Sequence, residues 1–113
     1  MAINVNMTKR DLFNAKNASL SVSDAVDSGE SYTVSGVALV ENAGTSKSGD
    51  VCDVGYIATD AGVFGFTSKV LISALPELAE ILSDALDNGE IVNVRFNSNK
   101  NSKGTDFYTV NIV

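Results

Sequence analysis

The sequence predicts a mainly β domain in which a single helix separates three strands from two more. Three observations lead to this class. β-Branched and aromatic residues are concentrated in five short runs, polar turn segments divide those runs, and one longer stretch repeats leucine at helical spacing. The chain has 113 residues, 44% of them apolar, which is enough for one domain with its own core.

The first three strands are predicted at residues 31–40, 51–59 and 63–67. The first of these runs is rich in β-branched residues and follows the turn dipeptide Ser28-Gly29. Residues 42–50 are polar and contain two glycines, so they form the turn between the first and second strands. Asp60-Ala-Gly62 predicts a tight turn between the second and third strands.

The helix is predicted at residues 68–87, where apolar and acidic side chains occupy different faces. The apolar face consists of Leu75, Leu78, Ala79, Leu82 and Leu86, and the acidic face of Glu77, Glu80, Asp84 and Asp87. Because proline suits only the first turn of a helix, we expect a short helical turn from Ser68, a break near Leu75 and a main helix from Pro76. Asn88-Gly89 ends the helix.

The last two strands are predicted at residues 91–97 and 105–113, which completes the order β-β-β-α-β-β. This is the element order of the oligonucleotide-binding (OB) fold, a five-stranded barrel with one helix between strands three and four. The alternative is an α+β sandwich with the helix on an open sheet. The barrel is favoured because residues 42–50 and 97–104 correspond to the loops that flank the OB-fold ligand groove. These loops carry Lys47, Lys100 and Lys103.

Charge is distributed unevenly along the chain. The formal net charge is −6, yet from Val92 onward three basic residues, Arg95, Lys100 and Lys103, stand against one acid, Asp106. Residues 70–90 contain five acidic residues and no basic one. Such segregation lets a protein bind a polyanion on one side while it remains acidic elsewhere.

Alternation along the last two strands predicts which of their side chains face outward. In the fourth strand Val92, Val94 and Phe96 share a face, which leaves Arg95 on the other. In the fifth strand Phe107 lies outward, and we expect its ring beside Arg95. The alternative is that Phe107 covers a sheet edge or a dimer contact.

Two other aromatic residues are candidates for stacking on bases. Phe64 and Phe66 flank Gly65 and point the same way, so they are either core residues or a stacking platform. Tyr56 shares a face of the second strand with Cys52 and favours the core, but it is retained as a candidate.

Residues 1–28 are predicted to form an N-terminal arm that packs on or flanks the barrel domain, residues 29–113. Thr8 to Asp11 and Ser21 to Asp24 each have the spacing of a capped helix start. Three basic residues, Lys9, Arg10 and Lys16, make the arm either a solvated segment or a further DNA contact.

The residue inventory argues against catalysis and against a metal site. The chain has no histidine and one cysteine, Cys52, so zinc sites and histidine-based triads are excluded, and we expect Cys52 to be a buried core thiol. The glycine-bearing loops lack the Lys-Ser/Thr ending of a phosphate-binding loop. No apolar run approaches the ~18 residues of a membrane span, and the first residues do not resemble a secretory signal. We therefore predict no enzymatic activity, no cofactor, no metal and no membrane partner, in a reducing cytoplasm.

Several segments occur in an order that resembles a known family. They are Leu12-Phe-Asn-Ala15, Asp60 to Lys69, and Asn101-Ser-Lys-Gly104 followed by Phe107 and an alternating tail. Their spacing is similar to that of the small single-stranded DNA-binding proteins of bacteriophages, notably those of Bacillus phages that replicate by protein priming. The resemblance implies a replication protein that coats displaced single strands in the cytoplasm of the infected host, with aromatic side chains stacked on bases.

The charge layout and this resemblance together predict single-stranded DNA binding without strong sequence preference. Loop lysines would follow the phosphates and flat rings would accept any base. The predicted DNA-binding residues are Lys47, Tyr56, Phe64, Arg95, Lys100, Lys103 and Phe107. The expected partners besides DNA are a second copy or cooperative neighbours, and phage or host replication or recombination proteins. The alternative function is an acidic interaction module, or a DNA mimic, that binds a host protein.

Overall fold

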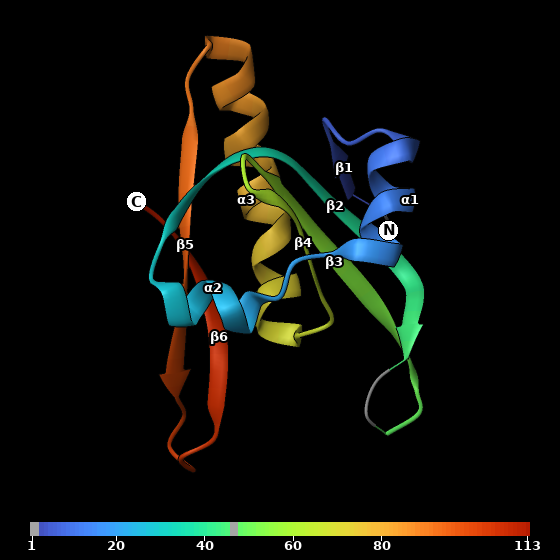
Figure 1. The fold of residues 1–113 in the computed structure, drawn as a ribbon, viewed down its shortest axis with the longest axis vertical. Helices are drawn as coiled ribbons and strands as arrows, with labels where there is room; N and C mark the ends of the chain where they lie inside the picture. Colours follow the sequence, from blue (N-terminus) through green and yellow to red (C-terminus); the bar gives the residue numbers. More distant parts are fainter. Residues whose placement is uncertain (1–2, 46–47) are drawn as a thin grey trace.

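The computed structural model describes residues 3–45 and 48–113 and has six strands and three helices in these ranges (Figure 1). The strands are β1 (Ile3–Val5), β2 (Ser31–Thr45), β3 (Val51–Thr59), β4 (Gly62–Phe66), β5 (Val92–Lys100) and β6 (Asp106–Ile112). The helices are α1 (Lys9–Ala18), α2 (Val22–Ser28) and α3 (Lys69–Asn88). The mainly β class is confirmed, whereas β1 was not predicted.

All strands join one antiparallel sheet in the order β4-β3-β2-β5-β6, with β1 on β2. β2 is long enough to serve two partners on one edge. Residues 31–34 of β2 pair with β5, residues 37–39 pair with β1, and β3 lies along the opposite edge. No ladder joins β4 to β6 within the described ranges, so the sheet is open.

The main core lies between the sheet and α3. The face of the sheet toward α3, called the inner face here, buries Val37, Ile57, Phe64, Val94 and Phe96 against Leu71, Leu75 and Leu82 of the helix. Phe64 is central, because its ring packs against Tyr32 and Phe96 at centroid distances of 5.0 and 4.9 Å. α2 adds Val22 and Ala25 to the same core.

Helix α3 is continuous from Lys69 to Asn88, so the expected break near Leu75 is wrong. Pro76 lies inside the helix on its exposed side, so its ring faces solvent, but it cannot donate the helical hydrogen bond to the Ile72 carbonyl. Leucines before and after it, Leu71 and Leu82, are each 1% exposed and pack into one core. Burial of both halves on the same face offsets the roughly 3 kcal/mol that an interior proline costs.

The N-terminal segment is part of the packed structure. Thr8 and Asp11 form the predicted capping box: the Asp11 N–H donates to Thr8 Oγ1 at 3.1 Å, and the Thr8 N–H donates to Asp11 Oδ2 at 2.9 Å. Ser21 is the N-cap of α2 but its side chain makes no capping hydrogen bond. α1 packs on the outer face of the sheet, opposite α3, in a second cluster made of Met7, Ala15, Ala38 and Tyr56.

Candidate nucleic-acid interface

The outer face of β5 and β6 carries a row of polar side chains next to the end of β2. Residues directly opposite in the ladders share a face, and the pairs Asn97↔Thr109 and Arg95↔Asn111 lie on the side away from α3. We call this surface the polar face. Its members are Thr33, Asn93, Arg95, Asn97, Asn99, Phe107, Thr109 and Asn111.

Hydrogen bonds between neighbouring strands hold the polar face in place. Thr33 Oγ1 donates to Asn93 Oδ1 at 2.7 Å, across the β2–β5 pair. Asn99 Nδ2 donates to Thr109 Oγ1 at 2.9 Å, across the β5–β6 pair. Arg95 is exposed among these amides. The surface therefore offers one cation with amide and hydroxyl groups, a set that can contact phosphates and base edges.

The hairpin between β5 and β6 presents the lysines. The strands extend further than predicted, so Lys100 ends β5 and the turn comprises residues 101–105. Asn101 shapes this turn, because its Oδ1 accepts the N–H of Lys103 at 2.9 Å and of Thr105 at 3.0 Å. Lys103 is exposed at the tip. Lys100 Nζ lies 3.4 Å from Asp106 Oδ1, so its charge is partly neutralised.

Phe107 does not lie beside Arg95 as predicted. It is opposite Asn99, whereas Arg95 is opposite Asn111, four residues further along β6. At about 3.3 Å per residue this separates the two positions by about 13 Å along the strand. Phe107 is half-buried on the polar face near the hairpin. It is the aromatic candidate that retains an accessible ring in this structure.

Phe64 and Tyr56, the other predicted stacking rings, are only 2% and 4% exposed. Phe64 is in the main core, and Tyr56 lies beneath α1. Burial raises the pKa of the Tyr56 phenol above its ordinary value of 10.0, because desolvation disfavours the phenolate. Neither ring is available for stacking in this conformation. The core alternative that the sequence left open for Phe64 and favoured for Tyr56 is therefore confirmed, and alternation alone could not decide it because it assigns a side chain to a face without showing what covers that face.

Lys47 lies outside the described residues, so the structure does not place this predicted contact. The ends of β2 and β3 nearest to it point toward the same end of the molecule as the β5–β6 hairpin, as Figure 1 shows. Lys9, Arg10 and Lys16 are exposed on α1. They are not on the polar face, because α1 covers β3 and β4.

Cys52 is half-buried, not buried as predicted. It is near the start of β3, opposite Gly44, which has no side chain to cover the thiol. No cluster of three or more metal-ligating side chains occurs in the described part of the chain. Within residues 3–45 and 48–113, no helix is both long and apolar enough to cross a membrane.

Comparison with known proteins gives no match to a family model, a curated protein or a solved structure.

Proposed function

We propose that this protein binds and coats single-stranded DNA through the polar face and the β5–β6 hairpin, in phage DNA replication or recombination. The observation that carries the proposal is the grouping of Arg95, the cross-strand amides and Phe107 on one open surface that ends in Lys103. Strand-coating proteins combine cations that follow the phosphates with rings that accept any base. The remainder of the chain has a net negative charge, which disfavours a polyanion over most of the other surface, although α1 carries Lys9, Arg10 and Lys16.

The strand connectivity supports the same proposal. Three strands, a helix and two strands, with β2 between β3 and β5, correspond to a partly open OB barrel. The OB ligand groove normally uses strands two and three, here β3 and β4. Because α1 covers that surface, we assign the DNA to the polar face of β5 and β6.

Fluorescence anisotropy with a labelled oligo-dT and the matching duplex, at low and moderate salt, tests the proposal. We expect preference for the single strand and a slope of log affinity against log salt near −2, since about 0.7 counterion is released per phosphate contact and three cations are available. Arg95→Gln with Lys103→Gln should weaken binding about tenfold at low salt. Phe107→Leu should remove a stacking contribution of about 1–3 kcal/mol.

Lys9→Gln on α1 is the matched control, because it removes one positive charge away from the polar face and should leave affinity nearly unchanged. Equal affinity for duplex and single strand, or no binding at low salt, would contradict the proposal.

A second function is favoured by the acidic surfaces. The exposed side of α3 carries Glu77, Glu80, Asp84 and Asp87, and Lys100 is already paired with Asp106. An interaction module that offers carboxylates to a basic host protein would use this side. Two double variants distinguish this function from DNA binding. If the chain binds a basic host protein, binding should survive Arg95→Gln with Lys103→Gln and should be lost on Glu80→Gln with Asp84→Asn.

A further inference from the structure

Strand β6 is the last strand of the sheet, and one of its edges is open. β5 pairs with β6 along all seven residues of β6, and no other described strand pairs with it. An open edge of this length is a template for pairing with another strand.

The hydrogen-bond pattern identifies which backbone groups face the open edge. The Asn101 N–H donates to the Thr105 carbonyl at 3.0 Å, and the Val113 N–H donates to the Asn93 carbonyl at 2.9 Å. In an antiparallel pair, hydrogen-bonded and non-hydrogen-bonded positions alternate. Residues 107, 109 and 111 therefore bond to β5, whereas the N–H and C=O groups of Asp106, Tyr108, Val110 and Ile112 point outward.

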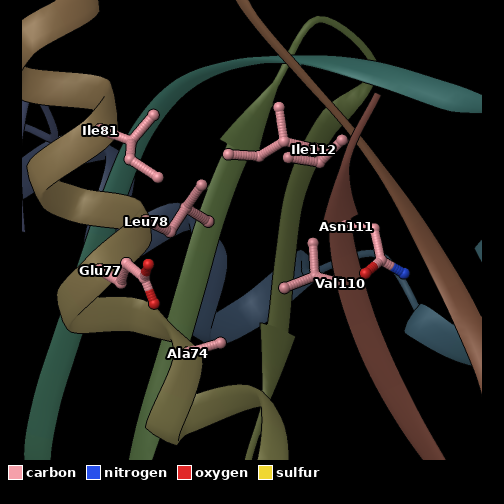
Figure 2. A pocket seen from close by; sticks show the side chains of 8 residues that line it. Ala74, Glu77, Leu78, Ile81, Val110, Asn111 and Ile112 are labelled. Atoms are coloured by element: carbon pink, nitrogen blue, oxygen red, sulfur yellow. The ribbon is translucent and has the colours of Figure 1, made fainter.

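An apolar cleft of about 210 Å³ opens between α3 and this edge (Figure 2). Val110 and Ile112 project from β6 toward Leu78 and Ile81 on the helix. Ile112 is 50% exposed and Ile81 is 37% exposed, so apolar surface remains uncovered beside the open edge. An added strand would cover this surface with its own inward-facing side chains.

Charges around β6 differ between its two ends. Lys100 and Lys103 lie at the hairpin end, where β6 begins at Asp106, and since Asp106 pairs with Lys100 the net positive charge of this end is that of Lys103. At the other end, Asp84 and Glu90 line a cleft with Ile112 and Val113. Any antiparallel pairing of two β6 strands brings the basic end of one copy to the acidic end of the other. The surface is therefore complementary to itself.

We propose that two copies of this chain associate through antiparallel pairing of their β6 strands. The register centred on Thr109 uses the whole open edge, because it places Tyr108 opposite Val110 of the other copy and Asp106 opposite Ile112. Each hairpin tip then extends past the other copy's Val113, toward its Asp84 and Glu90. Val110 of each copy then lies at the cleft beside α3, and Tyr108 lies at a separate cleft lined by residues 19–23 and 65–68 of its own chain.

The proposed β6 pairing does not require DNA. If the chain also binds DNA, as proposed above, the dimer would change its affinity for DNA. Antiparallel pairing of two identical strands relates the copies by a two-fold axis. The polar faces of the two copies would then form one continuous surface across this axis. A single strand bound there would cover both copies, which raises its affinity through multivalency. Self-association is therefore measured without DNA, so that failure of one proposal leaves the other unaffected.

Sedimentation velocity over a range of protein concentrations provides the first test. We expect the mass to rise from that of one chain, 11.8 kDa, to that of two. Ile112→Lys should abolish the dimer, because a lysine at an edge position opposes pairing. Val51→Lys is the matched control: Val51 is exposed at the start of β3, and its substitution should leave the dimer intact. A monomer at every concentration, or a dimer that survives Ile112→Lys, overturns the proposal.

Charge-reversal variants at the two ends of β6 test the antiparallel geometry of the dimer. Lys103→Glu and Glu90→Lys should each weaken self-association about tenfold, because two attractive pairs become repulsive. An equal mixture of the two variants should restore association, since every facing pair in the mixed dimer is again opposite in sign. Lys9→Glu is the control for a change of net charge. Failure of the mixture to associate more strongly than either variant overturns the proposed register.

Amide hydrogen exchange gives a residue-level readout on the unmodified chain. Exchange at Tyr108, Val110 and Ile112 should slow as protein concentration rises, because these amides become hydrogen-bonded in the dimer. Exchange at Phe107, Thr109 and Asn111 should depend less on concentration, because β5 already holds these amides. The reverse pattern, or no dependence at either set, contradicts pairing through this edge.

Discussion

At the scale of single residues, close packing of the sheet against α3 decides which positions tolerate change. Gly55 lies opposite Phe66 in the β3–β4 ladder and beneath the helix. A Cβ atom at this position would collide with the Phe66 ring and come within 2.7 Å of Leu75 Cδ1. Phe66 and Leu75 occupy the space that a side chain at residue 55 would need, so this position requires glycine.

Gly55→Ala is therefore expected to destabilise the fold by about 1–3 kcal/mol, the usual cost of overpacking a core. Urea unfolding followed by circular dichroism measures this cost. Ser35→Ala, at an exposed position of β2, is the control and should change stability by less than about 0.5 kcal/mol. Equal stability of the two variants would contradict the close approach of Phe66 and Leu75 to Gly55.

At the scale of elements, α3 shows how tertiary contacts prevail over local preference. Local preference places a break before Pro76, yet the helix continues through it. Packing alone explains this, since Leu75 is 0% exposed and Leu78 5% exposed on the two sides of the proline. Both leucines contact one apolar surface of the sheet, and a break between them would uncover one of them.

Pro76→Ala should consequently stabilise the protein by about 1–2 kcal/mol. The substitution restores an N–H donor inside the helix, and greater freedom of the unfolded chain offsets part of the gain. Thermal unfolding is the measurement, and a higher midpoint is expected. A lower midpoint would indicate that the proline is needed for the path of α3.

At the scale of the whole molecule, the N-terminal segment completes the core of the domain that follows it. β1 pairs with residues 37–39 of β2, α1 covers the outer face of β3 and β4, and Val22 of α2 packs in the main core. Val22 is only 6% exposed. Removal of these elements would uncover apolar surface on both sides of the sheet.

We expect deletion of residues 1–28 to abolish cooperative unfolding of residues 29–113, because the remaining sheet loses cover on both faces. Val22→Ala should cost about 1–3 kcal/mol, the range for a cavity in a packed core. Val51→Ala, at an exposed position, is the control and should cost far less. A truncated chain that unfolds as cooperatively as the full chain would show that residues 29–113 fold alone.

Much of the local structure was predictable from the order of the residues. Periodicity placed β3 at residues 51–59 as observed, and the stretch with helical spacing, residues 68–87, matches α3 within one residue at each end, although a break near Leu75 was expected inside it. These elements were predictable because their side-chain patterns repeat within a few residues. The capping box at Thr8 was predictable for the same reason.

Which surfaces are covered depends instead on how the elements pack together. Tyr56 and Arg95 both lie on the outer face of one sheet, yet α1 buries the first and leaves the second exposed. Likewise, the ladder register places Phe107 opposite Asn99 instead of beside Arg95, and it leaves the far edge of β6 open. Alternation within a strand cannot supply this information, because strand register and the cover over each face depend on contacts between residues far apart in the chain.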